Sequence, residues 1–334
     1  MGINRGILPG IKRITKRAGG TGFRFIMENT SVFHNECIVF MYHRVVKRMP
    51  TGLYDSGLCV TAQTFEMHMD LLTKLFTMVP LEDIAKSKPA GRVCAITFDD
   101  GWLDNFEVAY PILKKYQVPA TIFLPTAMIG TKQWFWFELI WDLARKSVIA
   151  QKQDQLVSYF QTHVPAWREM RVTVAGILQL IQCLKTKTAT ALEQQVQDAF
   201  HLLNLHLPTD RILINWEEAA EMGNNGITFG SHGLNHRILP SLGVKEKKEE
   251  IMDSFKVLRG HDIPFARVFC YPNGDWDEDC LKILSDSGYL GAVTTRTGSI
   301  QHDTTLFLMN RLGVHEDISD TPSLFSYRLF QVYK

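Results

Sequence analysis

Seven short apolar runs, each separated from the next by enough chain for a helix, constrain the fold of this 334-residue chain more than any other feature. The runs are residues 37–42, 93–98, 120–124, 227–230, 267–271, 290–295 and 308–314. Helical spacing of apolar residues lies between them, for example over residues 64–76 and 278–287. Strands that alternate with helices predict a parallel sheet, either open or closed into a barrel.

The alternation stops over residues 130–214, where a Gln- and Lys-rich helical pattern takes its place. We therefore expect a helical insertion within one α/β domain made of residues 31–129 and 215–334. An aromatic cluster from Trp134 to Trp141 opens the insertion. Its helical spacing is typical of core packing, and the alternative is a surface that meets lipid or stacks on sugar.

The charge of the chain is unevenly distributed. Residues 1–27 carry a net charge of +6 without an acid, and the remainder carries −5. Because the basic residues are confined to one end, we expect no nucleic-acid partner. We interpret residues 1–30 as a basic segment that lies on an anionic membrane surface, or else as a solvated terminus. Pro9, Gly10 and the pair Gly19–Gly20 predict that no long regular helix forms there.

The sequence predicts a cytoplasmic protein. The apolar pair Ile7–Leu8 is interrupted at once by Pro9–Gly10, whereas a secretory signal needs roughly 7–15 apolar residues. No apolar run approaches the roughly 20 residues of a membrane-spanning helix. Six cysteines without C-x-x-C spacing are typical of reduced thiols. Together with the basic segment, this predicts a peripheral position at the inner face of the membrane.

Two carboxylates, Asp99 and Asp100, end the apolar run 93–98. Parallel strands present their carboxyl ends at one face of an α/β domain. Burying an unpaired carboxylate is costly, so the two must be solvated, paired or bound to a metal. Taken alone, such a pair is also typical of a helix N-cap.

A second polar motif, His232 and His236, follows another of the runs. The four-residue spacing brings both rings to one side if the chain turns helically. Asp100 with the two histidines forms a three-ligand set for a divalent metal with open coordination positions. Asp99, next to this set but outside it, is placed to accept a proton from water. Surface polar residues are the alternative interpretation of the histidine pair alone.

Five strings together resemble the polysaccharide deacetylase family, the carbohydrate esterases with a NodB-homology domain. They are YHRV at 42–45, TFDDGW at 97–102, YPILKKYQVPATIFL at 110–124, FGSHGLNH at 229–236 and FCYPNG at 269–274. Their order and spacing cover about residues 37–315. The resemblance implies a distorted (β/α)7 barrel that removes an N-acetyl group, or less often an O-acetyl group, from a sugar by hydrolysis.

The resemblance also implies roles for single residues. Asp99 corresponds to the general base, and Asp100, His232 and His236 correspond to the ligands of a divalent metal, usually Zn²⁺. The backbone N–H of Tyr271 corresponds to a donor that holds the oxyanion of the tetrahedral intermediate.

Two departures from the family pattern concern the groups around Asp99. Cys270 stands where many members carry an arginine that orients this aspartate. Arg311 could reach Asp99 from the opposite side and replace that hydrogen bond, or could form a structural salt bridge.

The second departure concerns the general acid. His315 is the histidine nearest the end of the last strand, where the family has this acid, but the sequence around His315 matches the family motif poorly. The alternative is His43 as the acid, or a metal-bound water without a dedicated acid. His43 is otherwise a substrate contact or a structural histidine of the barrel mouth.

We therefore predict a metal-dependent N-deacetylase that acts on an acetylated amino sugar or glycan. A lipid-linked or nucleotide-linked substrate of cell-envelope or glycan assembly fits a cytoplasmic enzyme better than a finished extracellular polysaccharide. One alternative is a barrel that binds a glycan or a partner protein with little or no turnover. The other is a hydrolase of a non-sugar amide, which would use the same residues.

Overall fold

The structure is a computed structural model that describes residues 7–29, 37–87, 90–185, 187, 189–301 and 304–333. Outside the described residues lie 1–6 and 30, which belong to the predicted basic segment, and 31–36, at the start of the predicted α/β domain. The chain folds as two units. One consists of Met1–Met49, Ser56–Gly130 and Leu213–Lys334, and the other of Pro50–Asp55 and Thr131–Ile212.

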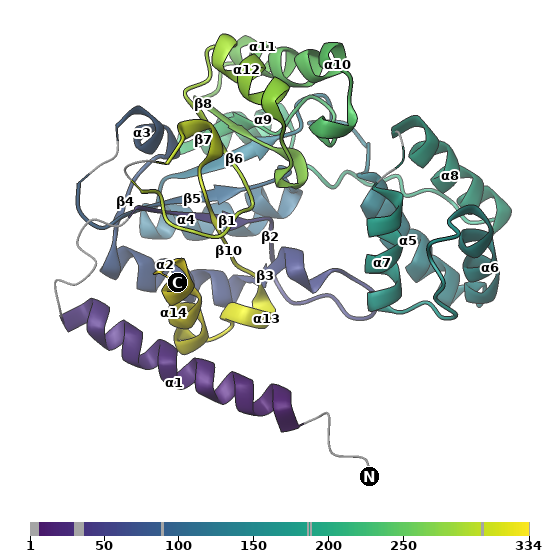
Figure 1. Ribbon diagram of the computed structural model, residues 1–334, viewed down its shortest axis with the longest axis horizontal. Coiled ribbons are helices and arrows are strands. Elements are labelled where there is room, and N and C mark those ends of the chain that lie inside the picture. The colour runs from purple at the N-terminus through teal and green to yellow at the C-terminus, as the bar shows by residue number, and fades with distance from the viewer. Residues whose placement is uncertain are drawn as a thin grey trace. The chain divides into compact units, whose positions relative to one another are not determined.

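A parallel sheet forms the centre of the first unit (Figure 1). Seven strands lie in the order β10-β1-β5-β6-β7-β8-β9, each adjacent pair is parallel, and β4 pairs with β5. The strands are β1 (Cys37–Tyr42), β4 (Thr77–Met78), β5 (Val93–Phe98), β6 (Ala120–Leu124), β7 (Ile227–Ser231), β8 (Phe265–Cys270), β9 (Gly291–Val293) and β10 (Leu312–Gly313). An isolated parallel bridge pairs Val293 in β9 with Met309, three residues before β10. The predicted α/β fold, a distorted barrel of seven strands, is confirmed.

The strands β1, β5 and β6 coincide with the predicted runs because nearly every residue in them is buried. The last two runs are longer than their strands. Residues 306–308 form a single helical turn, so β10 begins only at Leu312. A separate pair of short parallel strands, β2 (Arg44–Val46) and β3 (Cys59–Thr61), was not predicted.

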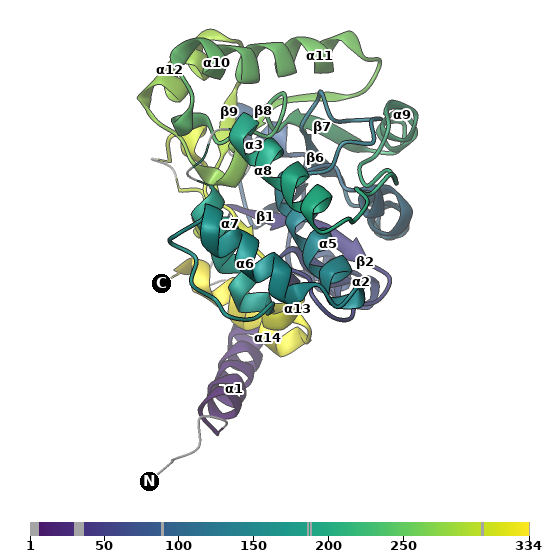
Figure 2. The same ribbon diagram turned by 90° about the vertical axis from the view of Figure 1, so that its right-hand side faces the viewer.

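Helices join successive strands and surround the sheet. They are α2 (Ala62–Leu75), α3 (Leu81–Lys86), α4 (Tyr110–Tyr116), α9 (Trp216–Gly223), α10 (Val244–Lys248), α11 (Ser254–Gly260), α12 (Glu278–Asp286), α13 (Glu316–Ser319) and α14 (Pro322–Phe330). Side-chain caps define several of their starts: Thr61 caps α2, and Asn215 with Glu218 forms a capping box on α9. In Figures 1 and 2, α10, α11 and α12 lie on the opposite side of the sheet from α14.

The second unit is a helical bundle with its own core (Figure 2). Its helices are α5 (Trp136–Ile149), α6 (Gln153–His163), α7 (Val174–Leu184) and α8 (Ala189–Leu202). Ile140 and Trp141, both 1% exposed, belong to this core, and Phe137 from the predicted aromatic cluster is partly buried against it. The core-packing interpretation of these three residues is therefore confirmed.

The N-terminal segment differs from the prediction, because α1 is one continuous helix over Ile7–Asn29. Pro9 falls in the first turn, where backbone N–H groups have no partner within the helix and a proline costs no hydrogen bond. Gly20 is explained by packing: a Cβ at this position would lie 1.8 Å from the carbonyl oxygen of Ser323 in α14. The glycine permits a close helix–helix approach, and this tertiary contact outweighs its low helix propensity.

Contacts along α14 hold α1 in place, and Figures 1 and 2 show the two helices side by side. The rings of Phe23 and Phe330 lie 5.3 Å apart between their centroids. Arg13 forms an ion pair with Asp320, which lies two residues before the start of α14. Within the described ranges, neither α1 nor any other helix has the length and apolar character needed to cross a bilayer.

The close approach at Gly20 can be tested with a matched pair of glycine substitutions. Gly20→Ala places a methyl group against the backbone of α14, so we expect it to lower the free energy of unfolding by about 1–3 kcal/mol. A Cβ at Gly22 meets nothing within 4 Å, so Gly22→Ala should raise the free energy of unfolding by about 0.5–1 kcal/mol through helix propensity. Denaturant unfolding of both variants measures the difference. Stabilisation by both substitutions would show that α1 does not pack closely on α14.

Candidate active site

The chain turns sharply where β5 ends, and this turn separates the two adjacent aspartates. Asp100 and Gly101 both have positive φ, 74° and 68°. A Cβ at Gly101 would lie 2.7 Å from Leu124 Cδ2, so the turn is closely packed as well. A non-glycine residue in the left-handed region costs about 1–3 kcal/mol, and such strain is concentrated at functional sites. The turn gives Asp99 and Asp100 different partners.

Asp99 pairs with Arg311, which lies just before β10. The guanidinium donates from Nη1 to Oδ1 at 2.6 Å and from Nη2 to Oδ2 at 2.7 Å. Arg311 is 0% exposed and Asp99 is 2% exposed. Burial alone would raise the pKa of Asp99, but the guanidinium more than offsets burial and holds that pKa below its usual value. Asp99 is therefore an ionised, rigidly oriented carboxylate at neutral pH.

Cys270, at the end of β8, also contacts the Arg311 guanidinium. Its Sγ is 3.2 Å from Nη2 of Arg311. The remaining guanidinium bonds go from Nε to the Thr294 carbonyl at 2.9 Å and from Nη1 to Thr97 Oγ1 at 3.2 Å. The short side chain at position 270 leaves the space that Arg311 fills, so the charge reaches Asp99 from the β10 side instead of the β8 side.

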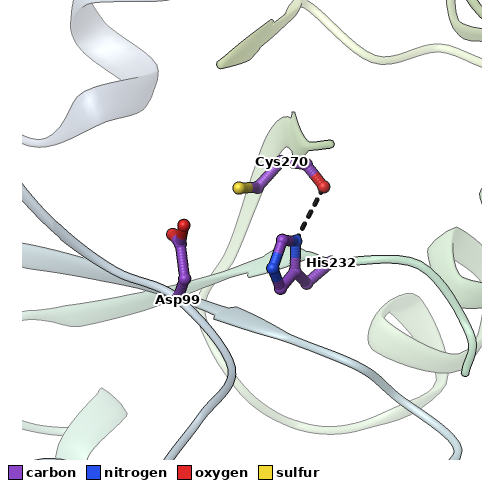
Figure 3. A group of neighbouring side chains, drawn as sticks. All are labelled: Asp99, His232 and Cys270. Carbon is purple, nitrogen blue, oxygen red and sulfur yellow. Dashed lines mark hydrogen bonds between the residues drawn. The ribbon is translucent and has the colours of Figure 1, made fainter. Parts of the chain in front are cut away.

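Asp100 faces the two histidines. Its Oδ1 lies 3.4 Å from His232 Nε2 and 3.2 Å from His236 Nε2. The side chains of Asp100 and His232 are 4% and 3% exposed, and that of His236 is 14% exposed. His232 Nδ1 donates to the Cys270 carbonyl at 2.8 Å (Figure 3). This bond leaves Nε2 facing Asp100. An imidazole held in this way through its second nitrogen is typical of a metal ligand.

The electrostatics of this cluster suit a cation. Burial lowers the pKa of His232, but the neighbouring acidic groups, with Asp100 and Asp99 among them, more than offset burial and raise this pKa well above its usual value. A proton is therefore favoured where the imidazole meets Asp100. One carboxylate oxygen and two imidazole nitrogens are also a donor set that Zn²⁺ accepts. Asp100, His232 and His236 could thus hold a divalent metal.

A second trio, Asp99, His232 and Cys270, also brings three donor groups within ligand distance of one another (Figure 3). Its environment does not suit a cation. The Arg311 guanidinium already bonds to both Asp99 and Cys270, and burial raises the pKa of the Cys270 thiol, which keeps it protonated. The cation site therefore belongs on the Asp100 side.

A sequence profile described as polysaccharide deacetylase matches residues 86–158 and 179–292. These residues make up more than half of the chain, and they contain both aspartates and both histidines of the cluster. The chain belongs to the polysaccharide deacetylase family. The resemblance predicted from the motifs is confirmed, and membership supports a deacetylase enzyme. The matched region ends before Arg311 and His315, so the interpretation of these two residues depends on the structure.

Relatives and solved structures agree with this family. The Bacillus subtilis (strain 168) protein YxkH, named for the same family, is 24% identical over 287 residues, which are 84% of this chain and 72% of that protein. The poly-β-1,6-N-acetyl-D-glucosamine N-deacetylase of Staphylococcus epidermidis is 27% identical over 221 residues, 59% of this chain and 72% of that protein. The deacetylase PplD of Streptococcus pyogenes, solved with acetate, has a TM-score of 0.56 at 18% identity and covers 90% of this chain and 99% of its own. The last comparison shows a shared fold.

The segment from His232 to His236 of this deacetylase is a loop, so the two rings lie on one side without the helical turn that their spacing would have required. Gly233 and His236 have positive φ, 80° and 57°. Glu250, 2% exposed, accepts hydrogen bonds at Oε2 from the backbone N–H groups of Leu234 and Asn235, both at 2.9 Å. These bonds fix the loop so that the two imidazole rings lie 4.8 Å apart. Glu250 was not predicted, because its sequence position gives no sign of this distant contact.

Trp102 is a second residue that sequence reasoning missed. Its indole Nε1 donates to Asp100 Oδ2 at 3.0 Å, and the ring is 1% exposed. This bond occupies one carboxylate oxygen and leaves Oδ1 toward the histidines. The Arg44 guanidinium lies over the indole ring, 4.6 Å from its centroid, and Asp104 holds Arg44 through a 2.8 Å bond. The only sequence signal was the position of Trp102 directly after the motif Asp99-Asp100-Gly101.

The other predicted site residues occupy different places. His43 Nε2 lies 3.8 Å from Asp99 Oδ2, and its side chain is 20% exposed. The Tyr271 N–H donates to the Val293 carbonyl at 3.3 Å, a long bond for an N–H donor. His315 stands at the N-terminus of α13, where its Nδ1 is 3.9 Å from Asp317. The structure therefore brings His43 and Arg311 to Asp99, and places His315 on the segment that follows β10.

The role of Trp102 can be tested by metal titration. Trp102→Phe removes the indole donor to Asp100, so we expect the affinity for Zn²⁺ or Co²⁺ to fall about 10–100-fold, as for other bonds that orient a ligand. The matched control is Trp134→Phe, since the Trp134 indole donates to the Asp210 carbonyl in the second unit. Competition with a chromophoric chelator measures both affinities. An unchanged affinity in Trp102→Phe would remove this residue from the support of Asp100.

Proposed function

We propose that this deacetylase hydrolyses the N-acetyl group of an acetamido sugar or glycan with the help of a bound divalent metal. The supporting observation is the convergence of Asp100, His232 and His236 next to an ionised Asp99. The Staphylococcus epidermidis relative, named as a poly-N-acetylglucosamine deacetylase, suggests the substrate class.

Asp100, His232 and His236 would hold the ion, and their one-carboxylate, two-imidazole set favours Zn²⁺. When bound, such an ion supplies Lewis-acid chemistry and increases the acidity of water. The protein's own contribution is to fix these donors: Trp102 holds Asp100, and the Cys270 carbonyl holds His232. Both supports are buried, which limits the movement of the ligand atoms.

Asp99 would accept a proton from the attacking water as the water oxygen bonds to the acetyl carbon. Arg311 contributes by keeping this carboxylate charged and oriented, although it also makes Asp99 a weaker base. Cleavage of the carbon–nitrogen bond then yields acetate and a free amine, which must be protonated as it leaves. The Tyr271 N–H would stabilise the oxyanion if it exchanges the Val293 carbonyl for the acyl oxygen.

For the protonation of the amine we propose His315, with His43 as the alternative because it faces Asp99 at 3.8 Å.

The proposal also includes Zn²⁺ as the native ion and a lipid-linked or nucleotide-linked substrate at the cytoplasmic side of the membrane. In the described part of the chain the six cysteines form no disulfide and five of them are buried, which agrees with a reducing compartment. The Arg311–Asp99 pair argues against a barrel without turnover, since it provides the orienting charge that Cys270 lacks.

The proposed reaction predicts that acetate release from a panel of acetamido sugars and chitooligosaccharides depends on Asp99 and on metal. Asp99→Asn should lower kcat about 10²–10⁴-fold while the bound metal is retained, because only the proton acceptor is lost. Asp100→Asn and treatment with a chelator should remove both metal and activity. Asp286→Asn, at the exposed end of α12, is the control. Absence of acetate from every sugar, or release that resists metal removal, would contradict the proposal.

The assignment of the acid predicts a difference between two types of leaving group. His315→Ala should lower the rate on an acetamido sugar about 10²-fold or more and should leave the rate on an activated aryl acetate nearly unchanged. The reason is that an amine needs a proton to depart, whereas an aryl oxide does not. His43→Ala is measured in parallel. If only His43→Ala discriminates between the two substrates, His43 is the acid and the assignment of His315 is wrong.

A further inference from the structure

The helix α1 has a second, outward side that the protein core does not use. Gly20 and Phe23 face α14, and on the same side of the helix Phe23 and Met27 are 5% and 2% exposed. On the opposite side, Phe25 is 66% exposed and Ile26 is 42% exposed. In the sequence, isoleucines at positions 7, 11 and 14 continue the helical period of position 25 toward the N-terminus.

From this arrangement we infer that the outward side of α1 docks on an anionic lipid surface. We call this interaction surface, which Phe25 and Ile26 represent, the α1 outer face. The inference goes beyond the proposed chemistry and does not depend on it. A helix with one apolar side and flanking cations lies in the plane of a membrane interface, with its apolar side among the acyl chains.

Charge supports lipid as the occupant. The helix contains five basic residues and one acid, whereas the chain outside residues 1–27 has a net charge of −5. Arg17 is exposed, and Arg24 lies 3.6 Å from Glu28, the one acid of the helix. An anionic membrane would attract α1 and repel the rest of the protein, which favours contact through this helix alone.

A second copy of the chain is a poorer occupant. Two α1 helices would bring like charges together. A helix of 23 residues is about 35 Å long and presents a side roughly 10 Å wide, on the order of 350 Å² per copy. Stable dimers bury about 800 Å² per partner.

Docking through α1 would also orient the catalytic unit. Arg13 pairs with Asp320, five residues after His315 in the segment that follows the carboxyl end of β10. The N-terminal half of α1 is thereby attached to the chain that leaves the active-site edge of the sheet.

The inference is tested by co-sedimentation of the full chain with vesicles of phosphatidylcholine, with and without phosphatidylglycerol. We expect binding to the anionic vesicles that weakens at high salt. Phe25→Gln with Ile26→Gln, and separately Arg17→Glu, should each lower the partition coefficient about tenfold. The matched control is Val244→Gln, because Val244 is also an exposed apolar residue, at 49%, but lies on α10.

Melting temperature and acetate release from a soluble sugar should be the same in all these variants, which separates loss of docking from loss of folding or catalysis. The inference is overturned if the wild type does not bind anionic vesicles, or if the α1 variants bind them as well as the control does. It is also overturned if the α1 variants change the oligomeric state in light scattering and leave vesicle binding unaltered, since the outer face would then join two copies of the chain.

Discussion

The buried ion pair between Arg311 and Asp99 is the interaction on which the site depends. Each partner is almost inaccessible to solvent, so neither charge is stable there without the other. Removing one partner of such a pair typically costs about 3–5 kcal/mol, because the remaining charge stays buried. The pair also joins the chain at the end of β5 to the chain at the start of β10, two strands separated in the sheet by β1. The charge state of Asp99 and the position of β10 beside the sheet are therefore linked.

Different partners give two adjacent carboxylates different properties. Asp99 pairs with a guanidinium, which keeps the carboxylate ionised and fixed in orientation. Asp100 instead faces two imidazoles and a tryptophan N–H. The positive φ of Asp100 turns its side chain away from Asp99. The repulsion expected between neighbouring carboxylates is thus offset by separate partners, and one residue suits proton transfer while the other suits metal ligation.

The sequence predicted those parts of the fold and site that local pattern determines. The strands β1, β5 and β6 follow from their burial on both faces, and Asp99 and Asp100 from their position at a strand end. Glu250 was missed because it supports the histidine loop over a long sequence separation. The helix α1 was predicted wrongly because its glycines looked like breaks, whereas Gly20 is required by contact with α14. Both errors come from tertiary contacts that no local pattern encodes.

Cys270 and Arg311 are best understood as a coupled pair of positions. The Cys270 sulfur already lies 3.2 Å from the guanidinium, so a long side chain at position 270 would occupy the space of Arg311. Conversely, a short side chain at 270 without Arg311 would leave Asp99 buried without a cation. The missing arginine on β8 is therefore no sign of a lost site, because the same electrostatic requirement is met from β10. What must be preserved is one guanidinium against Asp99, whichever strand supplies it.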